Sequence, residues 1–267
     1  MITMDAYFTI VTYLLTAILG LCVGSFLNVV IYRVPEGLSL ATPASHCPKC
    51  KHMIGARDNI PVLSYLFLRG KCRHCGVHIP FRYTAVELAN AALWLLSVYL
   101  FWNVSIPFAV IVALCCSTLL CVFFIDLSHM LVFDRFVLIL AALGVGATFF
   151  DPYYGWLSHV IGGLVGFFSF YAIAAIFARV RGKEGLGGGD IKLTGAMGLL
   201  LGWERLLLAV LIASVVASVL LSVLTRRDEK RGEGEREYPF APFLSVGYAI
   251  SLFFGATLIN AYLSLLF

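Results

Sequence analysis

The sequence predicts an all-α polytopic membrane protein with about eight transmembrane helices. Of its 267 residues, 61% are hydrophobic and only 13% are charged, whereas soluble domains carry about 25% charged residues. The apolar residues come in runs of about 20, the length at which one helix crosses a hydrocarbon layer about 30 Å thick. A soluble fold of this composition would leave large apolar patches in water, so a soluble enzyme and a disordered chain are both excluded.

Eight apolar segments are predicted to span the membrane. The first follows Asp5 and has no Lys or Arg before it, so we interpret it as a retained span rather than a signal peptide. The sixth is short and contains glycine, which makes it the least regular of the eight. The predicted spans are 7–32, 85–103, 106–125, 131–149, 157–178, 191–202, 205–224 and 241–265.

The basic residues predict which side of the membrane each loop faces. Lys and Arg concentrate in the loops 33–83, 179–190 and 225–240, and only Arg205 falls on the opposite side. Short loops rich in Lys and Arg stay cytoplasmic, so we expect both termini to be periplasmic. The stretch from Arg226 to Glu237 has no apolar residue and is predicted to be a solvated linker. The basic residues form no patch with interleaved aromatics, so no nucleic-acid partner is expected.

Two C-x-x-C pairs lie in the first cytoplasmic loop, and 21 residues separate Cys47 and Cys50 from Cys72 and Cys75. Two such pairs are typical of a four-thiolate zinc site, and disulfides are not expected on the reducing side. A structural zinc ion would stabilise a loop too short to form its own core. The alternatives are free thiols, a redox pair, or a catalytic metal that takes a ligand from His46, His52, His74 or His78. The other cysteines lie in apolar segments and are interpreted as small hydrophobic residues: Cys22, Cys115, Cys116 and Cys121.

Two aspartates are candidates for catalysis, because an acid in or beside a membrane span is costly. Asp126 ends the third predicted span and Asp190 begins the sixth, and the charge pattern places both at the cytoplasmic edge. Two carboxyl groups brought together share one proton. Such a pair provides a general base to deprotonate water and a general acid for a scissile carbonyl and its leaving amine. In the alternative interpretation, Asp126 caps the next helix or pairs with a basic residue, and Asp190 is a helix N-cap.

A glycine run precedes Asp190 and comprises Gly187, Gly188 and Gly189. Without Cβ atoms this backbone can approach a substrate strand or take a positive φ, and the helix N-terminus that follows favours an ionised Asp190. The run is similar to a dinucleotide-binding loop, but that loop must follow a strand, and this one follows a membrane span. Asp134 is interpreted as the start of the fourth span. Glu87 could bind either a partner charge or a substrate group.

Several motifs together resemble the type IV prepilin peptidase family of aspartic membrane proteases. They are GSFLNVVIYR at 24–33, DNIP at 58–61 between the cysteine pairs, an Arg-Tyr…Glu segment at 82–87, and GGGDIKL at 187–193. The resemblance runs nearly end to end. It implies that Asp126 and Asp190 are catalytic and cleave the leader of type IV prepilins or type II secretion pseudopilins at the cytoplasmic membrane edge. Many members have a second aspartate where this chain has Ser128, and a proline where it has Phe133.

The same resemblance implies cofactors and a division of the chain. Family members often N-methylate the new N-terminus with S-adenosylmethionine, for which the implied contacts are Asp58, Asn59 and Glu87. The glycine run and Lys192 are expected to form an active-site loop that contacts the substrate. The division is a first helix at 1–33, a cytoplasmic zinc and methyltransferase region at 34–84, and a seven-helix peptidase domain at 85–267, all in a bacterial inner membrane. The alternatives are a peptidase without methyl transfer and a proton-coupled transporter. A transporter would place its acids near the midplane of two repeated halves, and no internal repeat is evident.

Overall fold

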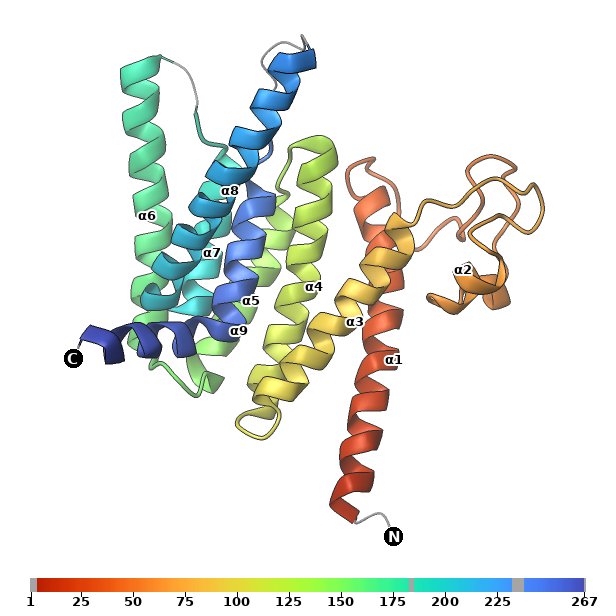
Figure 1. Cartoon of the computed structure of the whole chain (residues 1–267), viewed down its shortest axis with the longest axis horizontal. Helices are drawn as coiled ribbons and strands as arrows, with labels where there is room; N and C mark the ends of the chain where they lie inside the picture. Colours follow the sequence, from red (N-terminus) through yellow and green to blue (C-terminus); the bar gives the residue numbers. More distant parts are fainter. Residues whose placement is uncertain (1–3, 183–184, 232–237, 267) are drawn as a thin grey trace. The chain divides into compact units, whose positions relative to one another are not determined.

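The computed structural model describes residues 4–182, 185–231 and 238–266, and their regular structure is helical apart from two isolated β-bridges (Figure 1). The predicted all-α class is therefore confirmed. The elements are α1 (Met4–Arg33), η1 (Ala56–Asn59), α2 (Leu63–Phe67), α3 (Arg82–Phe101), α4 (Ile106–His129), α5 (Asp134–Phe150), α6 (Trp156–Arg181), α7 (Gly188–Leu201), α8 (Trp203–Arg231) and α9 (Ala241–Leu266).

Six of these helices are long and apolar enough to cross a membrane: α1, α3, α4, α6, α8 and α9. The chain is thus a polytopic membrane protein, and each of the eight predicted spans corresponds to a helix. Helices α5 and α7 are shorter, with 17 and 14 residues. At 1.5 Å per residue α7 extends only about 21 Å, less than the thickness of a hydrocarbon core. The prediction of a linker that starts at Arg226 is wrong for its first six residues, because α8 continues to Arg231. Residues 232–237 lie outside the described part.

The chain divides into two compact units, Met1–Leu100 and Phe101–Phe267. The first contains α1, α2 and nearly all of α3, and the second contains α4 to α9. Helix α3 therefore groups with the first helix and the cysteine loop. The boundaries predicted at residues 33 and 84 rest on function and stay predictions.

Small residues allow α1 and α3 to pack closely in the first unit. A Cβ added to Gly24 would lie 2.7 Å from Cα of Glu87, so only glycine fits there. Beside this contact, Asn90 Nδ2 donates to the Gly20 carbonyl at 2.7 Å, and Asn28 Nδ2 donates to the Tyr83 carbonyl at 2.9 Å. Close backbone approach with interhelical amide hydrogen bonds is a typical way for membrane helices to associate.

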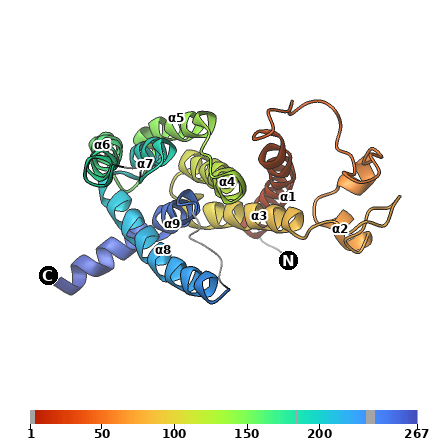
Figure 2. The same ribbon diagram turned by 90° about the horizontal axis from the view of Figure 1, so that it is seen from above.

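Helix α7 is the buried centre of the second unit. Its apolar side chains are almost fully enclosed, including Leu193, Met197, Leu200 and Leu201. Figure 2 shows α7 lying against α5 and α6. The contact with α6 is close, because a Cβ on Gly162 would lie 2.3 Å from the Gly198 carbonyl oxygen. Because α7 is packed this tightly, its first turn, which carries Asp190, belongs to a rigid element.

Candidate active site

Asp126 lies where α4 ends and α9 begins. It occupies the last turn of α4 and is only 5% exposed. Its Oδ2 accepts a hydrogen bond from the backbone N–H of Ala241, the first residue of α9, at 3.1 Å. The first N–H groups of a helix have no partner within the helix and form a partial positive charge, so this position suits a carboxylate. Asp126 therefore caps a helix, as one alternative expected, but that helix begins 115 residues later rather than next in the chain.

Asp190 is the third residue of α7 and is tied to α9 through its own backbone. Gly187 is the N-cap of α7, so the alternative that Asp190 is an N-cap was wrong. The Thr194 hydroxyl donates to the Asp190 carbonyl at 2.8 Å and accepts a 2.7 Å hydrogen bond from the hydroxyl of Tyr248. Tyr248 is fully buried on α9. Helix α9 thus contacts Asp126 with its first N–H and supports Asp190 two turns further along.

The electrostatics of Asp190 show that the two carboxyl groups interact. Asp190 lies at the edge of α7, outside the six candidate spans. Burial first, and the negative charge of Asp126 second, raise the pKa of Asp190 to about 7. The helix N-terminus was expected to favour the ionised form, and the cost of burying the charge outweighs that effect. A pair of this kind can hold a single proton near neutral pH.

The glycine run is explained by a close approach rather than by positive φ. A Cβ on Gly189 would lie 2.8 Å from Cβ of Val132, whereas a Cβ on Gly188 would meet nothing within 4 Å. A Cβ on Gly187 would lie 3.5 Å from Asp190 Oδ2. None of the three takes a left-handed conformation. The segment after α4 and the start of α7 therefore touch beside Asp190.

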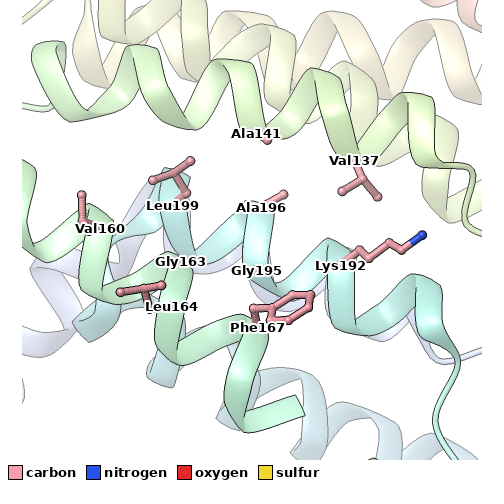
Figure 3. A pocket seen from close by; sticks show the side chains of 10 residues that line it. All are labelled: Val137, Ala141, Val160, Gly163, Leu164, Phe167, Lys192, Gly195, Ala196 and Leu199. Atoms are coloured by element: carbon pink, nitrogen blue, oxygen red, sulfur yellow. The ribbon is translucent and has the colours of Figure 1, made fainter. Parts of the chain in front are cut away.

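Lys192 lies on a different face of α7 from Asp190. At 100° per residue, two positions separate the side chains by about 200°. Lys192 Nζ pairs with Asp134 Oδ1 at 2.7 Å, and both side chains are exposed. It also lines an apolar groove of about 440 Å³ between α5, α6 and α7, in which its ammonium group points out at one end (Figure 3). Asp134 begins α5, as predicted. Neither Asp126 nor Asp190 lines this groove.

The four cysteines of the loop form one cluster, with their sulfur atoms all within 4.8 Å of one another. Sulfur atoms at the corners of a tetrahedron around zinc, with Zn–S distances of about 2.3 Å, lie about 3.8 Å apart. The Sγ atoms of Cys47 and Cys75 are 3.8 Å apart. A hydrogen bond from the backbone of Cys50, helped by one from the backbone of Lys49, lowers the pKa of Cys47 to about 6, although burial acts in the opposite direction and raises it. A thiol that ionises readily is the form that binds metal, so the cluster fits a metal ion.

The two cysteine pairs share one local geometry. Cys47 N–H donates to the His52 carbonyl at 3.0 Å, and Cys72 N–H donates to the Val77 carbonyl at 2.9 Å. In each pair the residue after the second cysteine has positive φ, 59° at Lys51 and 68° at Gly76. Each pair is therefore a turn that points both sulfur atoms to one place.

The three residues implied for the methyl donor lie around this loop. Asp58 accepts two hydrogen bonds from Arg73, at 2.6 and 2.8 Å, and these lower the pKa of its carboxyl group. Arg73 lies between the second pair of cysteines, so this ion pair joins the DNIP segment to the turn that carries Cys72 and Cys75. Glu87 Oε2 accepts the Val62 N–H at 2.8 Å. Asn59 ends η1 and is exposed. Sequence reasoning found these residues but not their partners.

The remaining sequence predictions can also be placed. Cys115, Cys116 and Cys121 are buried in α4, as expected of small hydrophobic residues, and Cys22 is exposed on α1. Arg33 is buried and donates to the Ser39 and Pro43 carbonyls at 2.8 and 2.6 Å. Sequence reasoning missed a buried group at the other end of α7, where Arg205 pairs with Asp151 and His159 Nε2 lies 3.4 Å from Asp151 Oδ2. It also missed Ala241, Thr194 and Tyr248; only the proline after Ala241 marks a helix start.

Comparison with known proteins identifies the family. The family model named bacterial peptidase A24 N-terminal domain matches residues 18–101, and the one named type IV leader peptidase family matches residues 113–222. Proteins named prepilin leader peptidase/N-methyltransferase are similar along most of the chain. The relative from Burkholderia pseudomallei (strain K96243) is 37% identical, over 89% of this chain and 84% of its own length. The relative from Dichelobacter nodosus is 34% identical, over 89% of this chain and 90% of its own. The relative from Pseudomonas aeruginosa is 36% identical, over 94% of this chain and 93% of its own length. No solved structure matches significantly. The chain belongs to the type IV leader peptidase family.

Proposed function

We propose that this protein cleaves the leader peptide of type IV prepilins or type II secretion pseudopilins, and that Asp126 and Asp190 perform the chemistry. The names of its relatives support this substrate class and also support N-methylation of the new N-terminal residue. The observation that carries the mechanism is electrostatic: Asp190 is half-buried at the start of α7, and the charge of Asp126 contributes to the raised pKa of its carboxyl group.

The two carboxyl groups have different surroundings, which suggests different roles. The Ala241 N–H and the positive end of α9 stabilise a charge on Asp126, so Asp126 is the general base. Burial favours the protonated form of Asp190, so Asp190 is the general acid. Because the two carboxyl groups titrate together, their protonation is a property of the pair rather than of either residue.

These roles give a balanced two-step hydrolysis. In the first step Asp126 removes a proton from water, the water oxygen attacks the scissile carbonyl carbon, and Asp190 gives its proton to the carbonyl oxygen. In the second step the C–N bond breaks, Asp126 gives its proton to the leaving amine, and Asp190 recovers one from the tetrahedral intermediate. No covalent enzyme intermediate forms, and both aspartates return to their starting states.

Single substitutions test this mechanism, with a matched acid as control. Asp126→Asn and Asp190→Asn are each co-expressed with a candidate prepilin, and leader loss is measured. Both variants should fail to cleave, because one carboxyl group cannot fill both proton roles. Asp134→Asn is the control, since Asp134 is exposed and pairs with Lys192, and it should cleave normally. Full cleavage by either of the first two variants rejects the mechanism.

The second activity is assigned to the loop between α1 and α3. The cluster Cys47, Cys50, Cys72 and Cys75 would hold a zinc ion that stabilises the loop. Bound S-adenosylmethionine would supply the methyl group, and Asp58, Asn59 and Glu87 are the proposed contacts. The mass of the mature N-terminus distinguishes this proposal from a peptidase without methyl transfer, since it differs by one methyl group. We also propose that the aspartates and the cysteine loop face the cytoplasm and both termini face the periplasm of a bacterial inner membrane.

A further inference from the structure

The short helix α2 exposes an apolar surface that the proposed chemistry does not use. Four side chains form it, one just before α2 and three on the helix: Ile60, Leu63, Leu66 and Phe67, with exposed fractions of 47%, 49%, 63% and 81%. We call them the α2 patch. Two of them, Leu63 and Phe67, are one helical turn apart, and Leu66 lies beside Phe67. A cluster of large apolar side chains this exposed marks an interaction surface.

The position of α2 along the membrane helices is fixed by Glu87. Glu87 is buried on α3, five residues after the helix begins, and its Oε2 accepts the N–H of Val62, the residue before α2. Five residues of helix correspond to about 7.5 Å along the axis. Figure 1 shows α2 below the upper ends of α1 and α3, level with their membrane-spanning parts. The patch therefore lies at the depth of the outermost acyl chains rather than beyond the headgroups.

The backbone at Val62 indicates that this placement is enforced. Val62 has φ 61° and ψ −50°, a conformation that a β-branched residue avoids and that surrounding structure must maintain. The bond to Glu87 provides that constraint at the entry to α2. At the exit, the Gly70 N–H bonds to the Tyr65 carbonyl at 2.9 Å and turns the chain away.

The charges around the patch complement an anionic membrane surface. Arg57, Arg69, Lys71 and Arg82 are all exposed on the segments that flank it. The nearby acid, Asp58, is neutralised by Arg73. Apolar side chains flanked by Lys and Arg are characteristic of segments that lie in the membrane interface, with the cations at the phosphates.

We propose that α2 is an interfacial anchor, and that the α2 patch inserts among the acyl chains of the leaflet on the side of the cysteine loop. The occupant of this surface is the lipid bilayer itself. The anchor would hold the two C-x-x-C turns against the membrane surface. Through the ion pair between Arg73 and Asp58 it would fix the DNIP segment there as well. This proposal does not depend on the peptidase or on the methyl transfer.

Photocrosslinking to lipid tests the anchor in the full-length protein. Benzoylphenylalanine replaces Phe67, or Leu66 in a second variant, and the purified protein is placed in nanodiscs of phosphatidylcholine and phosphatidylglycerol. Ala41 is the control position: it is exposed in the same loop, within the segment 39–43 that Arg33 holds at the end of α1. After illumination, mass spectrometry identifies the adducts.

The anchor predicts phospholipid adducts at positions 66 and 67, at several times the yield found at position 41. Adducts enriched in phosphatidylglycerol over the bulk mixture are expected because of the basic residues, and a bulk ratio would contradict the role given to them. Protein adducts to residues 101–267 or to a second copy would overturn the proposal, as would equal lipid yields at positions 41 and 67. The absence of lipid adducts at both 66 and 67 would also overturn it.

Discussion

Adding one methyl group should affect catalysis differently at Gly188 and at Gly189, the two residues just before Asp190. In Gly189→Ala the new Cβ would lie 2.8 Å from Cβ of Val132, and carbon atoms in contact prefer about 3.5–4.0 Å. The start of α7 must therefore move by about 1 Å relative to the segment after α4. Overpacking of this kind typically costs about 1–3 kcal/mol of folding free energy. Because Asp190 is the next residue, its carboxyl group moves with the helix, and a misplacement of this size lowers a reaction rate by about 100-fold.

The matched control is Gly188→Ala, whose Cβ would meet nothing within 4 Å. Alanine in the first turn of a helix is more favourable than glycine by about 0.5–1 kcal/mol, so this variant should be at least as stable as the parent. The assay measures kcat for leader cleavage in reconstituted protein, together with the thermal unfolding midpoint. We expect Gly189→Ala to lose most of its kcat and Gly188→Ala to retain it. Equal rates in the two variants would refute the reasoning, because the close approach at Val132 would then have no influence on the site.

Three further predictions concern the acid, its support and the metal. The proposed general acid, Asp190, must be protonated to act, and its pKa is raised to about 7, so kcat should fall about tenfold per pH unit above neutrality; a rate that is constant from pH 7 to 9 contradicts this role. Tyr248→Phe removes the hydrogen bond to Thr194, worth about 1 kcal/mol, so kcat should fall about fivefold with KM unchanged, and a change in KM alone would argue against a positioning role. Cys72→Ser should lose the bound metal and lower the unfolding temperature, as measured by elemental analysis and calorimetry, while a metal-free wild-type protein would exclude the metal site.

Local patterns predicted the parts of this protein that depend on neighbouring residues. The apolar runs predicted the helices, and the two C-x-x-C pairs predicted the sulfur cluster, because each depends on spacing within a short segment. The limits appear where a side chain depends on a distant partner. The family resemblance placed Lys192 in the active-site loop, because this residue belongs to the GGGDIKL motif. The helical period puts its side chain on the groove side of α7, where it pairs with Asp134.

The partner of Asp126 shows the same limit more strongly. Nothing near Asp126 in the sequence indicates that the N–H of Ala241 will meet it, since the contact joins two ends of the chain's second unit. The position of α9 results from packing of its first part, in which the buried residues run from Ala241 to Gly255. One example is Gly247, where a Cβ would lie 2.3 Å from the Ala209 carbonyl oxygen of α8. Sequence spacing alone carries no information about such a contact.

Helix α9 also suggests how the two acids of the proposed site are held in place. An unpaired carboxylate in an apolar environment is costly, and two of them repel each other. The first N–H of α9 offsets the charge on Asp126, and the hydroxyl of Tyr248 on the same helix fixes Asp190 through Thr194. Because one rigid helix supports both residues, the distance between the carboxyl groups is set by helix geometry rather than by their mutual repulsion. The charge then distributes unequally, and Asp190 keeps the proton, because for this residue the cost of burying a charge outweighs the effect of the α7 N-terminus.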